Sequence, residues 1–154
     1  ARCQRRGLPF SVLMLDVDHF KHINDTHGHP GGDALLAALG KLLQTQVRAE
    51  DIACRYGGEE FTVLLPEAGA EQASLRAEQL LQAIRALRVE HMGHELPAVT
   101  ASIGIAVAGR DGAEHLLQRA DQALYRAKHE GRNRVVVDGQ GQASARDPDG
   151  GCNR

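Results

Sequence analysis

Residues 55–61 read RYGGEEF, a pair of glycines followed by two adjacent glutamates. Apolar runs flank this stretch, residues 52–54 before it and residues 61–65 after it. Short apolar runs on both sides of a glycine turn are typical of a β-hairpin. The stretch therefore predicts two antiparallel strands joined by a sharp turn, with Glu59 and Glu60 at that turn.

The rest of the chain alternates strand-like and helical patterns around this hairpin. Before the hairpin, the predicted elements are a buried strand over 10–17, a short polar helix or turn through Gly28, and a helix over the following residues to about 48. After the hairpin, they are a helix over 70–88, a strand over 98–108, a helix from about 113 to 129, and a short strand at VVVD. Apolar spacing on the 70–88 helix marks Leu75 and Leu80 among its core positions. Gly104, inside the 98–108 strand, indicates a bulge or a close backbone approach. The order predicts an α/β sandwich with a mostly antiparallel central sheet flanked by helices.

Composition limits what the chain can be. It has 154 residues, 42% of them hydrophobic and 25% charged, with a net charge of -2, which suits one globular domain and gives no reason to expect nucleic acid as a partner. We expect the domain to cover residues 1–138 and residues 139–154 to form a disordered tail. The sequence contains no long apolar run and no signal-peptide pattern, and its odd number of widely spaced cysteines suits a reducing, cytoplasmic compartment.

Two acidic pairs lie at strand ends, Asp16 with Asp18 and Glu59 with Glu60. If the 10–17 strand lies beside the hairpin, these carboxylates meet at one end of the sheet. Such oxygen ligands suit Mg²⁺ or Mn²⁺, which complete their coordination with water and substrate phosphates. The alternative is that these acids are simply solvated. The glycines beside Glu59 leave room for a bulky ligand, which favours the metal site.

Other chemistries have weaker support in the sequence. Four histidines, His19, His22, His27 and His29, suggest zinc, but no cysteine joins them and no HExxH pattern is present. The chain has no GxSxG pattern for a serine nucleophile. Phosphates could be bound by the cationic side chains of Lys21, Lys128 and Arg132, and by the free backbone amides of a helix that starts near residue 18. Taken alone, each of these three cations is more simply explained as a solvated surface residue.

Taken together, RYGGEEF, the upstream MLDVDHFKHINDTHGHPGGD and the downstream AKHEGRNRV closely resemble the GGDEF domain of bacterial diguanylate cyclases, in its GGEEF variant. The resemblance covers residues 8–137. It implies a fold similar to those of nucleotidyl cyclases and polymerase palm domains. It also implies an enzyme that condenses two GTP molecules into cyclic di-GMP with release of two pyrophosphates, depends on Mg²⁺ or Mn²⁺, and acts as a homodimer.

The resemblance also implies roles for individual residues. By position in the motifs, the metal ligands are Asp16, the carbonyl of Val17, Glu59 and Glu60, and the catalytic residues are Glu59, Glu60 and Lys128. The guanine base contacts Asn24 and Asp33, and the nucleotide lies on Gly57 and Gly58. The terminal phosphates contact Lys128, Arg132 and the amides leading to Lys21.

Just before the hairpin, RAED at 48–51 matches the family's RxxD product-inhibition site, so that Arg48 and Asp51 are expected to bind cyclic di-GMP. On its own, RxxD occurs often by chance as a surface pair. Two alternatives remain: a non-catalytic cyclic di-GMP receptor, and a cyclase with relaxed base choice, against which the guanine-accepting Asp33 argues.

The start of the chain departs from the family pattern. GGDEF domains normally open with a helix and a DxLTGLxNRR-like segment, whereas ARCQRRG stands here. We therefore expect a domain that lacks its usual first helix, and a sensory module preceding it in the full-length parent, which could be tethered to a membrane.

Overall fold

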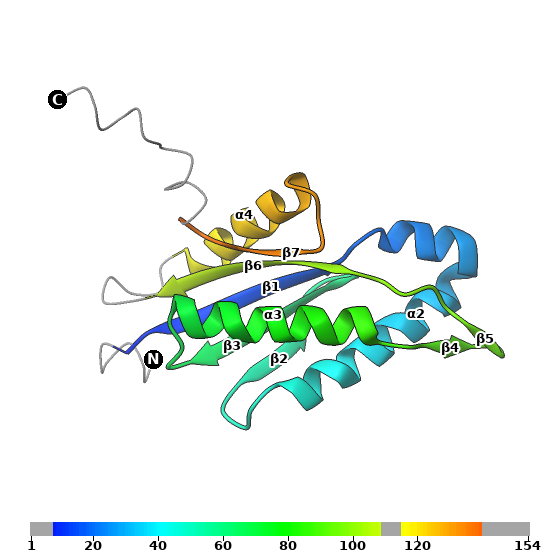
Figure 1. The fold of residues 1–154 in the computed structure, drawn as a ribbon, viewed down its shortest axis with the longest axis horizontal. Helices are drawn as coiled ribbons and strands as arrows, with labels where there is room; N and C mark the ends of the chain where they lie inside the picture. The colour runs from blue at the N-terminus through cyan, green and yellow to red at the C-terminus, as the bar shows by residue number, and fades with distance from the viewer. Residues whose placement is uncertain (1–7, 109–114, 140–154) are drawn as a thin grey trace.

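The structure, a computed structural model, describes residues 8–108 and 115–139. Its centre is a five-stranded sheet in the order β2-β3-β1-β6-β7 (Figure 1). The strands are β1 (Phe10–Val17), β2 (Ile52–Arg55), β3 (Glu60–Pro66), β6 (Ala101–Ala108) and β7 (Arg134–Val137). Neighbouring strands are antiparallel except for the parallel pair β6 and β7. The predicted α/β sandwich with a mostly antiparallel sheet is confirmed.

Helices cover the two faces of this sheet. On one face, α2 (Phe20–Gln46) and α3 (Ala70–Ala86) pack against the side chains of alternate β1 residues, Leu13, Leu15 and Val17. On the other face, α4 (Leu116–His129) covers the intervening residues of β1, including Val12 and Met14. This two-residue alternation is the expected consequence of strand geometry, so a central strand with a helix layer on each side is apolar throughout.

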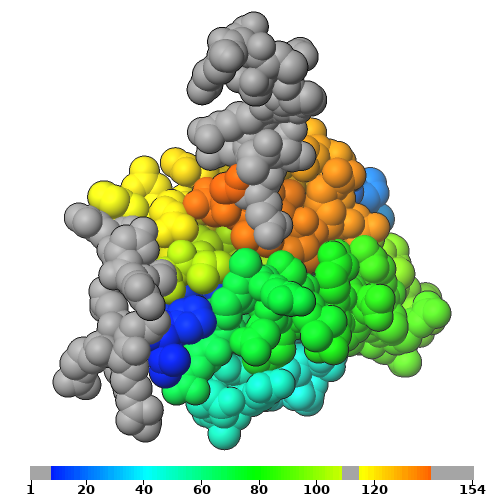
Figure 2. Space-filling view, turned by 60° about the vertical axis from the view of Figure 1, so that its left-hand side comes forward, coloured from blue at the N-terminus to red at the C-terminus, as the bar shows by residue number. Residues whose placement is uncertain are grey.

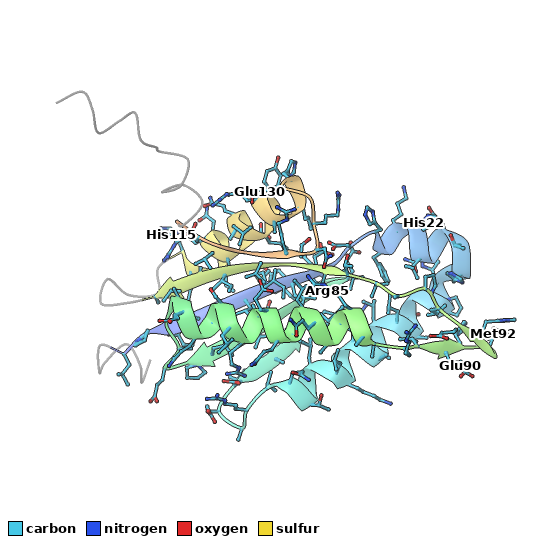
Figure 3. The ribbon with its side chains drawn as sticks, viewed as in Figure 1. His22, Arg85, Glu90, Met92, His115 and Glu130 are labelled. Carbon is cyan, nitrogen blue, oxygen red and sulfur yellow. The ribbon has the colours of Figure 1, made fainter. Side chains whose placement is uncertain are left out.

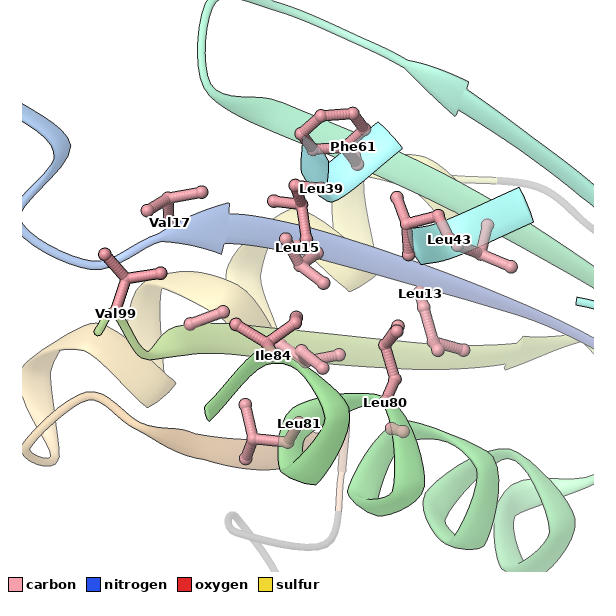
Figure 4. Close-up of a cluster of buried hydrophobic side chains, with 14 of the residues drawn as sticks. Leu13, Leu15, Val17, Leu39, Leu43, Phe61, Leu80, Leu81, Ile84 and Val99 are labelled. Atoms are coloured by element: carbon pink, nitrogen blue, oxygen red, sulfur yellow. The ribbon is translucent and has the colours of Figure 1, made fainter. Parts of the chain in front are cut away.

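The larger core lies under α2 and α3. Figure 4 shows how Leu39 and Leu43 of α2 and Leu80, Leu81 and Ile84 of α3 meet the β1 side chains there. Leu15 and Ile84 are fully shielded from solvent. On the face seen in Figure 2, the start of the described chain shows only as a small dark-blue patch beside green α3. The strand that carries Asp16 is thus anchored from both faces.

Gly104 lies in β6 where α4 crosses the strand. An added Cβ would lie 2.7 Å from the Cα of Leu124, and closer still to the Leu124 amide nitrogen and the Ala120 carbonyl oxygen. The register between β1 and β6 runs without interruption through this position, so there is no bulge. Of the two explanations predicted for Gly104, close backbone approach is confirmed: glycine lets α4 pack directly on the strand.

Helix α2 is interrupted near its start. Gly28 has φ 76° and ψ 167°, which are not helical values, and Pro30 follows two residues later. Glycine tolerates this conformation, and proline is favoured in the first turn of the helix that resumes after the break. The predicted polar helix and the following longer helix are therefore both present, with the kink between them, and the break turns the first segment relative to the second.

Some details differ from the sequence predictions. Leu75 is not a core residue, because its exposed fraction is 61%. A small hairpin, β4 (Glu90–His91) with β5 (His94–Glu95), was not predicted, since two-residue strands carry no periodic signal. The helix expected from about 113 begins at Leu116, and residues 113 and 114 lie outside the described residues. The same is true of the starting segment ARCQRRG and, beyond Gly139, of the expected tail.

No helix in the described part of the chain is both long enough and apolar enough to cross a membrane.

Candidate active site at the acidic end of the sheet

Three carboxylates gather at one end of the sheet, where β1 ends and β3 begins. In the β1–β3 register Asp16 is directly opposite Glu60, and the amide of Val17 lies 3.5 Å from the carbonyl oxygen of Glu59 as a marginal hydrogen bond. Side chains of directly opposed residues lie on the same side of an antiparallel pair. The sequence prediction that the acids of the first strand and of the hairpin would meet is confirmed for Asp16, Glu59 and Glu60.

The three carboxylates of this cluster are partly buried and close together, which disfavours their charged forms when no metal ion is bound. Burial raises the pKa of Asp16, which is only 4% exposed, and the ammonium of Lys128 partly opposes this rise. The pKa values of Glu59 and Glu60 are also raised, first by burial and then by the charge of Asp16. Asp121 of α4, which the sequence analysis missed, adds to the rise of the Glu60 pKa. Carboxylates that repel one another in a partly dry site favour a bound cation.

Lys128 is the cation that the structure places in this cluster. It lies in the last turn of α4, and its ammonium donates a hydrogen bond to Asp16 Oδ2. Its side chain is 34% exposed, while that of Asp16 is 6% exposed. The ammonium can therefore be reached by a ligand from solvent, and it neutralises part of the negative charge from within the site.

The GGEEF turn is open above these acids. The guanidinium of Arg55 braces it from behind by donating to the carbonyl oxygens of Gly57 and Gly58, at 3.3 Å and 2.6 Å. Neither glycine has a positive φ. A Cβ added to Gly58 would meet nothing within 4 Å, and one added to Gly57 would meet only Glu60, whose Oε2 would be 3.4 Å away. The value of glycine here is therefore the free space above the turn, not left-handed backbone, in agreement with the predicted ligand clearance.

A cavity of about 440 Å³ opens between α2 and the hairpin, lined by Asp33, Leu36, Gly40, Cys54 and Phe61 among others. Asn24 lies on the preceding turns of α2 and its side-chain oxygen is buried without a hydrogen-bond partner in the described structure. A Cβ on Gly32 would lie 3.0 Å from Asn24 Cγ and closer to its oxygen, so glycine is required for this packing. An unpartnered buried amide group is costly unless a ligand satisfies it.

Two further cationic residues lie at this end of the sheet. Arg132 follows α4, has φ 62°, and is close enough for its charge to lower the pKa of Asp16. Lys21 is exposed in the first turn of α2. Among the described residues, the amides of Phe20 and Lys21 have no backbone or side-chain acceptor, as is usual at a helix start. The structure thus brings the predicted phosphate contacts to the same end of the sheet.

Asp18 differs from the sequence interpretation, which grouped it with Asp16 as a metal-binding pair. Both of its oxygens are engaged: Ser102 Oγ and Thr100 Oγ1 each donate to it at 2.6 Å, and the amide of Asn133 donates at 3.0 Å. It is 5% exposed. Asp18 is therefore a structural acceptor that joins β1, β6 and the segment after α4.

The RxxD residues lie in a separate place. Asp51 accepts hydrogen bonds from the amide of Arg48, at 2.8 Å, and from the guanidinium of Arg76, at 2.5 Å. A cavity of about 770 Å³ is lined by these residues together with Glu67 and the exposed Leu75. Arg76 was missed because it lies on α3, and no spacing rule connects it to residues 48–51. The exposure of Leu75 is explained by its place at this cavity.

The histidines do not form a metal site in the described residues, where no three His, Cys, Asp or Glu side chains are placed to hold an ion by themselves. That finding also bears on the acidic cluster. A metal ion there would need oxygen atoms beyond the carboxylates, such as the Val17 carbonyl and the phosphates of a substrate.

Comparison with known proteins agrees with this fold. The family model described as diguanylate cyclase, GGDEF domain, matches residues 1–134. The chain is 42% identical over 129 residues to diguanylate cyclase DgcM of Escherichia coli, covering 83% of this chain and 30% of DgcM. It is 44% identical over 134 residues to the response regulator PleD of Caulobacter vibrioides, covering 84% of this chain and 29% of PleD.

Solved structures give the same result. The active GGEEF domain of a diguanylate cyclase from Vibrio cholerae superposes with a TM-score of 0.81 at 33% identity, covering 90% of this chain and 88% of that one. The GGDEF domain of DgcB from Caulobacter crescentus, in complex with c-di-GMP, superposes with a TM-score of 0.83 at 31% identity, covering 89% and 82%. The fold is thus that of the GGDEF α/β domains.

The chain belongs to the diguanylate cyclase GGDEF domain family. It spans about 30% of the length of the curated relatives described above.

Proposed function

We propose that this domain is a metal-dependent diguanylate cyclase, which condenses two GTP molecules into cyclic di-GMP and releases two pyrophosphates. The observation that carries the proposal is the convergence of Asp16, Glu59 and Glu60 with Lys128 under the open glycine turn. Its position in a chain of the GGDEF family supports this chemistry over the others considered. Because the reaction uses GTP, we place the domain in the cytoplasm.

The donor set fits Mg²⁺ or Mn²⁺. Asp16, Glu59 and Glu60 offer hard carboxylate oxygens, and Val17, whose amide lies 3.5 Å from the carbonyl oxygen of Glu59, would add its own carbonyl. Within the described part of the chain, no thiol or imidazole is among these donors. Burial is the main cause of the raised pKa values of all three acids, which remain raised although Lys128 opposes the rise, so a divalent cation would be favoured there. When bound, the ion would neutralise charge on the α-phosphate and favour ionisation of the attacking hydroxyl.

The chain's own residues have the following roles under this proposal. Asn24 and Asp33 bind the guanine edge, which satisfies the unpartnered Asn24 oxygen. Lys128, Arg132 and the amides before Lys21 bind the terminal phosphates. Glu59 accepts the proton of the 3′-hydroxyl, and Glu60 assists in holding the cation. A carboxylate at the position of Asp33 can accept two N–H bonds from guanine but not from adenine, which supports GTP over a mixed product.

Catalysis by this domain requires two copies. The reaction is symmetric, each nucleotide supplying one hydroxyl and one α-phosphate, whereas the guanine contacts proposed for one copy, Asn24 and Asp33, provide for one nucleotide. Two copies facing each other in antiparallel orientation bring the two nucleotides into line. Because the chain spans about 30% of its relatives' length, we expect a further module in the parent protein to control this pairing.

The Arg48–Asp51 cavity is proposed as a product-inhibition site. Its volume, about 770 Å³, is sufficient for a nucleotide, and the DgcB domain has been crystallised in complex with c-di-GMP. Arg48 is exposed, and its guanidinium makes no hydrogen bond or ion pair with another described residue, which would allow it to bind phosphate, while Arg76 contacts Asp51. The same cavity would serve the alternative function, a receptor that binds cyclic di-GMP without making it.

The first experiment separates these functions. The purified chain is incubated with GTP and Mg²⁺, and products are separated by mass. Formation of cyclic di-GMP that is abolished in Glu59→Gln supports the cyclase, with Glu78→Gln, an exposed acid of α3 that lines neither cavity described above, as the matched control for catalysis. Absence of product in the chain and in a longer form with the upstream segment, together with cyclic di-GMP binding that is lost in Arg48→Ala, would establish the receptor instead.

Product inhibition has its own test. Arg48→Ala is expected to leave the initial rate near that of the unchanged chain but to abolish the slowing of the reaction as product accumulates. If Arg48→Ala slows to the same extent as the unchanged chain, the regulatory site is not at this cavity.

A further inference from the structure

The segment that follows α4 has an unusual backbone. Three successive residues have positive φ: Gly131 at 126°, Arg132 at 62° and Asn133 at 50°. For residues with a side chain this left-handed region is sterically unfavourable, so two in succession persist only where surrounding contacts fix them. We refer to residues 131–133 as the Arg132 loop.

The Arg132 loop is fixed from two sides. Asn133 donates its amide to Asp18 Oδ2 at 3.0 Å, and its side-chain oxygen accepts a hydrogen bond from Arg85 Nε at 2.8 Å. Arg85 lies in the last turn of α3 (Figure 3). The amide of Arg132 itself donates to the carbonyl of Ala127 at 2.9 Å. Both contacts to Asn133 come from elements distant in sequence, β1 with its turn and α3.

Neither Asp18 nor Arg85 has a place in the proposed chemistry. The oxygens of Asp18 are used by hydroxyls of residues 100 and 102 and by Asn133. Arg85 forms its hydrogen bonds with Asn133, at 2.8 Å to the side-chain oxygen and 3.5 Å to the carbonyl. Both residues form a hydrogen bond with Asn133, which directly follows Arg132.

We propose that Arg85 and Asp18 are positioning residues that hold the Arg132 loop in its left-handed conformation, and thereby aim Arg132 at the terminal phosphates of the nucleotide. This inference rests on the proposed function, because it assigns the selectivity for a nucleoside triphosphate to contacts that do not touch the nucleotide. Without the Arg85 contact, the loop relaxes toward the ordinary right-handed region, and the guanidinium of Arg132 loses its fixed direction.

Arg85 is the better residue to test, because it is exposed, lies on another element, and is far in sequence from the predicted metal ligands. Arg85→Ala is expected to weaken binding of 3′-deoxy-GTP about tenfold, since a fixed arginine–phosphate contact is a strong, charge-assisted hydrogen bond. This ligand lacks the attacking hydroxyl and is not consumed. Binding of GMP, which has no terminal phosphates, is expected to be unchanged, and Arg85→Lys is expected to restore part of the lost affinity.

A background lacking Arg132 shows whether Arg85 acts through it. In Arg132→Ala, the further change Arg85→Ala is expected to have no additional effect on 3′-deoxy-GTP binding. A general structural role would instead lower affinity in both backgrounds and for both ligands. Arg88→Ala is the control, since Arg88 follows the same helix and pairs with Glu95 at 3.2 Å, away from the loop. Its affinities should equal those of the unchanged chain.

Hydrogen exchange of the Asn133 amide provides a readout without nucleotide. Exchange is expected to be faster in Arg85→Ala and unchanged in Arg88→Ala. Unchanged 3′-deoxy-GTP affinity in Arg85→Ala, equal loss for GMP, or unchanged Asn133 exchange would each overturn the positioning role while leaving the cyclase proposal intact. Failure of the unchanged chain to bind any guanine nucleotide would instead contradict the proposed function, and faster Asn133 exchange would then still show that Arg85 holds the loop.

Discussion

Replacing Gly104 by alanine tests how closely α4 is fitted to the sheet. The added Cβ would lie 2.7 Å from Leu124 Cα and closer to two other backbone atoms of α4, whereas carbon atoms in ordinary contact are about 3.5–4.0 Å apart. Backbone cannot move aside by changing rotamer, so the helix must shift by about 1 Å. Overpacking of this kind costs about 1–3 kcal/mol, and we expect Gly104→Ala to lie at the upper end, about 3 kcal/mol.

Urea denaturation followed by far-ultraviolet circular dichroism measures this loss, because the chain has no tryptophan to report unfolding by fluorescence. The melting temperature should fall by about 10 °C. Gly40→Ala, within α2, is the matched control. Its Cβ would be 4.0 Å from a side-chain carbon of Phe61 in β3, and better helix propensity should stabilise the domain by about 0.5–1 kcal/mol. A Gly104→Ala domain within about 0.5 kcal/mol of the unchanged chain would refute the packing argument.

Three other outcomes follow from the site. Burial and the charge of Asp16 raise the pKa of Glu60 in the folded domain. The stability contributed by protonated Glu60 is therefore present below the pKa that Glu60 has in the unfolded chain, and it is lost as the pH rises through the pKa that Glu60 has in the folded domain. In thermal melts without metal, Glu60→Gln should therefore raise the melting temperature more at pH 7 than at pH 4. Equal increases at the two pH values would show that the raised pKa of Glu60 does not affect stability. Mg²⁺ at pH 7 should raise the melting temperature of the unchanged chain but not that of Asp16→Asn; the same rise in both would place the ion elsewhere. Gly32→Ala, whose Cβ would crowd Asn24, should weaken GMP binding at least tenfold in calorimetry, and wild-type affinity would remove Asn24 from base recognition.

The hairpin and its acids could be predicted because the relevant signal is local. RYGGEEF contains both strand ends and the turn, and the strand before Asp16 is apolar on both faces, which predicts a central position. Once two such strands pair, their terminal carboxylates meet whatever the rest of the fold does. This is why the most specific part of the site was also the most predictable.

Partners from distant elements could not be predicted in the same way. Asp18 has the same sequence environment as Asp16, yet its neighbours in β6 and after α4 make it an acceptor for hydroxyls and an amide. Arg76 reaches Asp51 from a helix that begins only at Ala70. Leu75 fits the helical apolar period but lies at a cavity. In each case the outcome depends on which surfaces are packed together, and periodicity does not specify that.

The pair formed by Lys128 and Asp16 connects the metal site to the phosphate site. In the structure the ammonium of Lys128 offsets the charge of the buried Asp16 carboxylate, whose remaining neighbours are mostly acidic. A cation that neutralised Asp16 from another direction would weaken the attraction between Asp16 and Lys128. The side chain of Lys128, which is partly exposed, could then turn toward solvent. Under the proposed function, Asp16 would be one of the residues that hold the divalent ion, and the ion would supply the positive charge that Lys128 supplies in this structure. Lys128 would then be available as a phosphate ligand, so that the burial of Asp16 would couple binding of the ion to binding of the nucleotide.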